Sequence, residues 1–210
     1  PPLLPSIKGI ELGARYRAAM AEHLVGGDFY DVFRAGDRWG AIIGDVCGTG
    51  PEAAAVTGVA RYTVRALAPS STSPAQTMTA LNQALVHQRT ERRFLTAMYL
   101  LFDVQGGGID VALARAGHPP PVVVRSDASV TMLEEPKGTL LGIFDDAPLD
   151  DGSVRLEVGD SLVLYTDGVV EARSPGKEQF GYDRLEELLA SCAGRTADGI
   201  ARRVELAVAD

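Results

Sequence analysis

Three aspartates stand out because each lies beside glycine at the edge of an apolar run. Asp28 follows two glycines, Asp45 ends one apolar run, and Asp167 ends another and precedes a glycine. A carboxylate at the end of a buried strand is costly unless a cation satisfies it, and gathered carboxylates raise one another's pKa unless a metal neutralises them. Their oxygens suit Mg²⁺ or Mn²⁺ rather than zinc. If the three strand ends meet at one rim of a sheet, the sequence predicts a divalent-cation site there.

The segment around Asp45 also admits other interpretations. Aspartate favours turns because it bonds backbone amides, so Asp45 alone could be an ordinary turn residue. The chain also matches the relaxed dinucleotide fingerprint, as Gly48-x-Gly50-x-x-Ala53, after a strand and at the start of a helix. That fold needs a second parallel strand ending in an acidic residue about 20 positions later. Here a serine-proline loop and a second helix follow instead, and no Gly-Lys-Ser/Thr phosphate loop is present.

The hydrophobic pattern predicts strands, two helices, more strands and two further helices. A capping-box spacing at Thr49–Glu52 and a proline in the first turn mark the start of the first helix. This order differs from the alternation of a parallel doubly wound sheet, so we expect an α+β fold, an α-β-β-α sandwich of two mainly antiparallel sheets flanked by helices. The expected strands are 10–19, 28–34, 39–46, 95–104, 109–116, 122–125, 130–133, 154–158 and 161–166, and the expected helices are 51–67, 74–87, 182–192 and 196–208.

Composition limits the classes of function. The 210 residues are 46% hydrophobic and 23% charged, as in a soluble globular domain. A net charge of −8 opposes binding to nucleic acid, and no apolar run reaches the roughly 18 residues of a membrane span. Two cysteines, Cys47 and Cys192, cannot form a disulfide scaffold, which favours a reducing, cytoplasmic location. Since the chain begins at Pro1 rather than methionine, we expect it to be excised from a longer protein.

Five sequence motifs occur in the same order as in a known protein family. They are VGGDFYD at 25–31, IGDVCGTG at 43–50, AGHPP at 116–120, GD at 159–160 leading to YTDGVVEA at 165–172, and FG at 180–181. In this the chain resembles SpoIIE/RsbU-type phosphatase domains, the bacterial branch of the metal-dependent Ser/Thr protein phosphatases (the protein phosphatase 2C-like, or PPM, superfamily). The resemblance covers nearly the whole chain and implies one phosphatase domain over 1–210 with an α-β-β-α sandwich.

The resemblance also implies a site with two Mn²⁺ or Mg²⁺ ions. Asp45 would bridge both ions beside the carbonyl of Val46, while Asp28 would hold one ion and Asp167 the other. A shared water would attack the phosphorus in line, and no protein nucleophile would be needed. The family closes this site with an Asp-Asp pair before a final apolar strand. No such strand follows Asp210, so we expect the C-terminal strand to be lacking and one metal site to be incomplete.

The function implied is hydrolysis of phosphoserine or phosphothreonine in a protein. By resemblance, the substrate is a phosphorylated anti-sigma-factor antagonist in bacterial partner-switching signalling, with an N-terminal sensor or dimerising linker in the parent chain and a homodimer as the assembly. The alternative is a catalytically weak scaffold that binds a phosphoprotein or a partner domain. The missing last carboxylate favours the scaffold, whereas the intact Asp28, Asp45 and Asp167 favour the enzyme.

Three neighbouring residues are expected to have lesser roles. Asp31 should point to the opposite strand face from Asp28 and be exposed or lie behind the site. His118, between glycine and two prolines, is expected to belong to a structural turn rather than to act as a general acid. A lone small thiol such as Cys47 is expected to serve packing.

Overall fold

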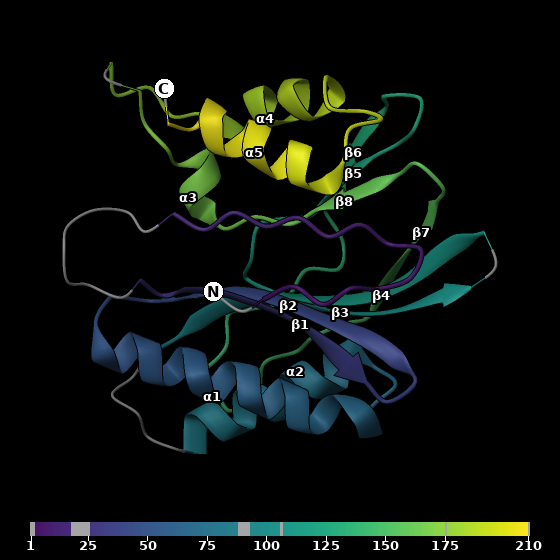
Figure 1. Ribbon diagram of the computed structural model, residues 1–210. Helices are drawn as coiled ribbons and strands as arrows, with labels where there is room; N and C mark the ends of the chain where they lie inside the picture. Colours follow the sequence, from purple (N-terminus) through teal and green to yellow (C-terminus); the bar gives the residue numbers. More distant parts are fainter. Residues whose placement is uncertain (1–2, 18–25, 88–92, 106, 175, 210) are drawn as a thin grey trace.

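The computed structural model describes residues 3–17, 26–87, 93–105, 107–174 and 176–209 in four layers, with two sheets between outer helices (Figure 1). The strand order is β1-β2-β3-β4-β7 in one sheet and β6-β5-β8 in the other, and every neighbouring pair is antiparallel. The larger sheet contains β1 (Asp28–Ala35), β2 (Arg38–Val46), β3 (Leu95–Gln105), β4 (Gly108–Ala116) and β7 (Gly152–Glu157), and the smaller contains β5 (Val122–Val124), β6 (Val130–Met132) and β8 (Ser161–Val163).

The larger sheet is buried on both faces, as strand β3 shows. Tyr99 and Leu101 enter the core on the side of the sheet that carries α1 and α2, whereas Met98 and Leu100 enter the core between the two sheets. Because side chains alternate between the faces of a strand, burial on both faces produces a continuous apolar run rather than alternation. On β2, Gly44 leaves the room that the ring of Phe29 occupies, since a Cβ there would lie 2.7 Å from that ring.

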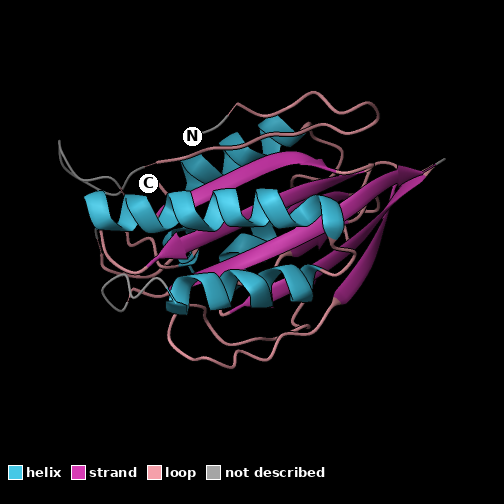
Figure 2. Cartoon of the chain, turned by 90° about the horizontal axis from the view of Figure 1, so that it is seen from below, coloured by secondary structure: helices cyan, strands magenta, loops and turns pink. Residues whose placement is uncertain are grey.

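Amphipathic helices cover the outer faces. Helices α1 (Pro51–Leu67) and α2 (Pro74–His87), joined by the short 3-10 turn η1 (Ala68–Ser70), lie across the larger sheet (Figure 2). Helices α4 (Gly181–Ala190) and α5 (Ala197–Ala207) cover the smaller sheet with apolar residues spaced four apart, such as Leu185 and Leu189. Within the described residues, no helix has the length and apolar character that crossing a bilayer requires.

The expected strand at 10–19 was wrong. Ile10 forms only an isolated bridge with Ile7, residues 11–17 form no strand, and residues 18–19 lie outside the described ones. Ile7 is nonetheless buried between the sheets, and the segment is fixed to α5 by an ion pair between Arg15 and Asp198 at 2.6 Å. The segment therefore buries apolar side chains without a ladder partner, a situation that the hydrophobic pattern cannot distinguish from a strand.

Two expected boundaries also differ. Gly50, rather than Thr49, is the N-cap of α1, and because glycine has no side chain it supplies no cap; the Glu52 carboxylate pairs with Arg93. Strand β8 ends at Val163 rather than at Thr166. Apolar residues continue after β8 into the cores on both sides, so the pattern extends beyond the backbone pairing.

Candidate active site

Two of the three aspartates face each other in the larger sheet. Asp28 opens β1 and lies directly opposite Asp45, the penultimate residue of β2. Side chains opposite each other in an antiparallel pair project to the same face, with Cβ atoms about 5 Å apart. The register follows from the tight turn at Gly36–Asp37, so the β1–β2 hairpin itself brings these two carboxylates together.

Gly27 leaves an oxygen-lined space beside this pair. A Cβ at Gly27 would lie 2.0 Å from the carbonyl oxygen of Val46 and 2.6 Å from Oδ1 of Asp45. Any larger residue would fill that space with carbon. The Val46 amide also donates to the Gly27 carbonyl at 3.1 Å, which holds the two segments together. A carboxylate oxygen and a backbone carbonyl oxygen therefore face one small volume.

The third aspartate, Asp167, lies just after the last strand of the smaller sheet. Asp167 begins the short helix α3 (Asp167–Val170), which follows β8, rather than ending a strand as expected. The side chain of Thr166 lowers the pKa of Asp28, which indicates that this segment lies close to the start of β1. The charge of Asp167 acts on both Asp28 and Asp45. The segment after β8 thus reaches the end of the sheet where the β1–β2 pair lies.

Burial and the charges of neighbouring aspartates raise the pKa of Asp28 and Asp45. Burial raises the pKa of Asp45 to about 6, and the charges of Asp28 and Asp167 add to the rise. Burial also raises the pKa of Asp28, with the Thr166 hydrogen bond acting against it and Asp167 reinforcing it. Asp28 and Asp45 therefore favour binding a proton or a cation more strongly than an ordinary aspartate does.

The donor set fits a hard cation. Three carboxylates and the Val46 carbonyl supply only oxygen, which is the preference of Mg²⁺ and Mn²⁺. In the part of the chain that the structure describes, no three His, Cys, Asp or Glu side chains are grouped closely enough to hold an ion as they stand. Asp210 lies outside the described residues. The role of Asp28, Asp45, Val46 and Asp167 as metal ligands stays a prediction.

Two residues near the site were not found from the sequence. The hydroxyl of Tyr16 lies 3.2 Å from the position that a Cβ on Gly26 would take. Burial raises the pKa of Tyr16, and so do the charges of Asp28 and Asp45. Arg93 donates to the carbonyl of Cys47 at 3.0 Å, in the turn that follows β2. Neither residue belongs to a motif with a chemical signature, so only the fold brings them to the site.

His118 is buried beside the site, as expected for a structural residue. Its Nδ1 lies 3.0 Å from the hydroxyl of Thr96, and Thr96 pairs with Asp45 between β2 and β3. The ring is 2% exposed, and burial lowers the pKa of His118 to about 4, so it is neutral at physiological pH. Arg115 donates to the His118 carbonyl at 2.9 Å, which holds this turn in place.

The other two expectations were wrong in part. Cys47 is exposed rather than packed in the core. Asp31 does point to the opposite face of β1 from Asp28, but it is buried, at 2% exposure. Its carboxylate forms ion pairs with two arginines of α1, Arg61 at 3.4 Å and Arg65 at 3.2 Å. The two arginines supply the compensation that a buried carboxylate needs.

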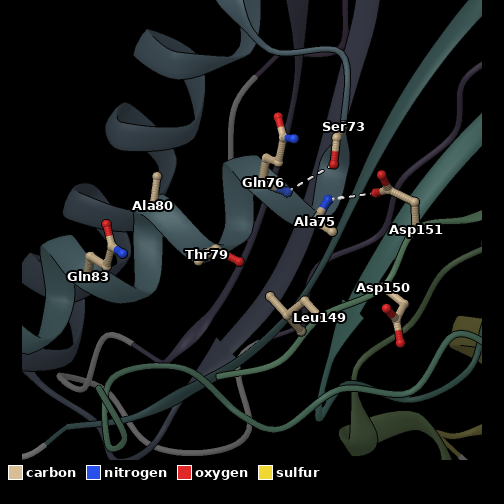
Figure 3. A pocket seen from close by; sticks show the side chains of 9 residues that line it. All are labelled: Ser73, Ala75, Gln76, Thr79, Ala80, Gln83, Leu149, Asp150 and Asp151. Atoms are coloured by element: carbon tan, nitrogen blue, oxygen red, sulfur yellow. Dashed lines mark hydrogen bonds between the residues drawn. The ribbon is translucent and has the colours of Figure 1, made fainter. Parts of the chain in front are cut away.

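The surface also has a hollow away from these aspartates. It lies between α2 and the loop before β7 (Figure 3), and none of the three aspartates lines it. Its polar groups already cap α2: Asp151 accepts from the Ala75 amide at 2.7 Å, and Ser73 accepts from the Gln76 amide at 3.0 Å. This hollow is therefore explained by the start of the helix.

Comparison with known proteins tests the resemblance. The family model of stage II sporulation protein E (SpoIIE) matches residues 35–210. The chain belongs to the SpoIIE family. Protein IcfG of Synechocystis is 30% identical over 217 residues, covering 90% of this chain and 33% of that protein. Phosphoserine phosphatase RsbU of Bacillus subtilis is 26% identical over 171 residues, covering 81% of this chain and 50% of that protein.

Solved structures agree on the fold of this SpoIIE-family chain. The RsbU and RsbW domains of Rv1364c from Mycobacterium tuberculosis match with a TM-score of 0.73 at 30% identity, over 95% of this chain and 54% of that one. The SiaA-PP2C domain of Pseudomonas aeruginosa matches with a TM-score of 0.75 at 23% identity, over 88% and 74% of the two chains. The predicted family and α-β-β-α fold are confirmed. The chain spans half or less of the length of the curated relatives named above.

Proposed function

We propose that this chain is a metal-dependent phosphatase domain acting on phosphoserine or phosphothreonine in a protein. The observation that carries the proposal is that Asp45 lies opposite Asp28, beside the Val46 carbonyl, and that the charge of Asp167 raises the pKa of both carboxyl groups. Its relatives include RsbU and RsbP of Bacillus subtilis, both phosphoserine phosphatases. The family and the donor chemistry therefore support the same reaction.

Each residue of the site would have its own role in metal binding. Asp45 and the Val46 carbonyl would hold Mn²⁺ or Mg²⁺ at the space beside Gly27, with Asp28 and Asp167 completing the acidic ring. When bound, such ions acidify water and neutralise charge on a phosphoryl group. Thr166 orients the Asp28 carboxylate through its hydrogen bond.

The biological setting is proposed from the relatives and the sequence. We propose one phosphatase domain over residues 1–210, within a longer cytoplasmic regulator that carries an N-terminal sensor or linker and forms a homodimer. The substrate we propose is a phosphorylated anti-sigma-factor antagonist in a partner-switching pathway. The support is the likeness to RsbU and to a protein in which RsbU and RsbW domains occur together.

The test is release of phosphate from a phosphoserine protein or peptide with and without Mn²⁺. Asp45→Asn removes the central charge with little change of shape, and we expect at least a 100-fold loss of rate. The matched control is Asp110→Asn, which removes an exposed carboxylate that pairs with Arg155 on the sheet surface, and it should keep the parent rate. Equal rates for the parent and Asp45→Asn would remove the proposal.

The second candidate is a regulatory scaffold that binds a phosphoprotein or partner domain without efficient catalysis. It is favoured by the lack, among the described residues, of a closed group of three metal-binding side chains. Calorimetric titration with Mn²⁺ separates the two functions. An enzyme binds the ion and loses that binding in Asp45→Asn, whereas a scaffold can bind its partner without taking up the ion.

A further inference from the structure

Two large apolar side chains are exposed next to each other in the loop that follows Leu141. Ile143 is 47% exposed and Phe144 is 53% exposed. Single exposed apolar residues are common, but adjacent ones on an ordered loop indicate an interaction site more often than chance placement.

This loop is held rigidly by one buried side chain. Asn82 of α2 is fully buried, its Oδ1 accepts from the amide of Gly142 at 2.8 Å, and its Nδ2 donates to the carbonyl of Phe144 at 2.8 Å. Burying an amide is costly unless its hydrogen bonds are made, and here the loop backbone makes them. The hydrogen bonds of Asn82 therefore hold the backbone of the loop that carries the exposed pair.

The loop begins at the same end of the larger sheet as the proposed active site, on the face that α1 and α2 cover. Leu95 pairs with Val46 between β2 and β3 and also bridges Leu141, so Leu141 lies two strand spacings, or about 10 Å, from Val46. A Cβ on Gly142 would lie 2.9 Å from the carbonyl of Arg93, whose guanidinium donates to the carbonyl of Cys47. The loop, Arg93 and the turn after β2 are thus contiguous.

The negative charge around the exposed pair limits which kinds of segment can bind there. Asp145 and Asp146 follow Phe144 directly, and both are exposed. The proposed site adds three more carboxylates, and the whole chain has a net charge of −8. An acidic segment would be repelled here, whereas an apolar segment with a basic residue would complement both the apolar pair and the aspartates.

We propose that Ile143 and Phe144 form the docking surface for the segment of the phosphoprotein substrate that flanks its phosphorylated residue. This surface takes an apolar side chain of the substrate, and Asp145 and Asp146 favour a basic residue beside it. The inference rests on the proposed function, because the loop begins at the end of the larger sheet where the phosphoryl group would be cleaved, and a substrate segment flanking that group can reach the pair.

The test compares a large substrate with a small one in the Mn²⁺-loaded protein. The substrates are a phosphoserine peptide flanked by leucine and lysine, a matched peptide flanked by serine and glutamate, and p-nitrophenyl phosphate, which has no flanking segment. The variant is Ile143→Ser with Phe144→Ser. The control is Val158→Ser, in the turn between β7 and β8, where the side chain is 82% exposed.

We expect the parent to prefer the leucine-lysine peptide at least 10-fold in kcat/KM. The double variant should lose that preference through KM and keep the parent rate on p-nitrophenyl phosphate, and the control should match the parent on all three substrates. A parent that cleaves none of them contradicts the proposed function itself. A parent that cleaves them while the double variant keeps the preference overturns the docking surface alone. The docking surface is also overturned if the double variant loses as much rate on p-nitrophenyl phosphate as on the peptide. It is overturned as well if the parent is a dimer, the double variant is a monomer, and the peptide kinetics are unchanged.

Discussion

Replacing Asp45 with asparagine should stabilise the metal-free protein at neutral pH while removing its activity. Burial, together with Asp28 and Asp167, raises the pKa of Asp45 from 3.8 to about 6. Between these values the folded protein holds a proton that the unfolded chain has released, so stability falls as pH rises and the full loss persists above pH 6. The rise corresponds to ~3 kcal/mol, and screening of this partly exposed side chain reduces the expected effect to ~1–2 kcal/mol.

The measurement is urea unfolding of the parent and Asp45→Asn with a chelator present. At pH 7.5 the variant should be more stable by ~1–2 kcal/mol, and by pH 4.5 the difference should shrink to about a third of that, because Asp45 is then protonated in the folded parent and partly protonated in the unfolded chain. Adding Mn²⁺ should reverse the order, since an ion at 100 times its Kd stabilises the parent by about 2.7 kcal/mol. A variant less stable than the parent at pH 7.5 without metal would refute this reasoning, because it would mean that a fixed partner already compensates the Asp45 charge.

Three further changes test how the fold supports the site, each by thermal or denaturant unfolding. Thr96→Val removes the hydrogen bond to His118 and leaves a buried ring nitrogen unpaired, so it should lower stability by ~1–3 kcal/mol, and an unchanged midpoint would contradict the role of that bond. Asp31→Ala leaves two arginines of α1 without their carboxylate, so it should also lower the free energy of unfolding by ~1–3 kcal/mol, and this loss should be smaller at high salt. A variant that is more stable than the parent would show that the cost of burying the carboxylate exceeds the gain from its ion pairs. Gly44→Ala places a methyl group against the ring of Phe29 and should destabilise by ~1–3 kcal/mol, whereas a neutral result would mean that the ring moves freely.

The parts of the fold that the sequence predicted well depend on local signals. The turn at Gly36–Asp37 lies between two strand patterns, and it determines which residues of β1 and β2 are opposite, Asp28 and Asp45 included. The helices around 51–67 and 74–87 have proline at their starts and apolar residues at helical spacing, and both occur as expected. Here the information lies within one hairpin or one helix.

The parts that could not be predicted depend on contacts between distant segments. Asp31 is buried because two arginines of α1 reach it, and nothing near Asp31 in the sequence indicates them. Ile10 lies in an irregular segment held against α5, so its burial resembles that of a strand residue. Tyr16 and Arg93 approach the site only through the packing of separate layers. In each case the decisive partner comes from elsewhere in the chain.

The most direct test of the central claim is anomalous X-ray diffraction at the manganese edge from crystals soaked in Mn²⁺. We expect an anomalous peak in contact with the carboxylate of Asp45 and the carbonyl oxygen of Val46, with Asp28 or Asp167 beside it, and no such peak in Asp45→Asn. A fully occupied peak elsewhere on the protein, with these oxygens bound only to water, would contradict it.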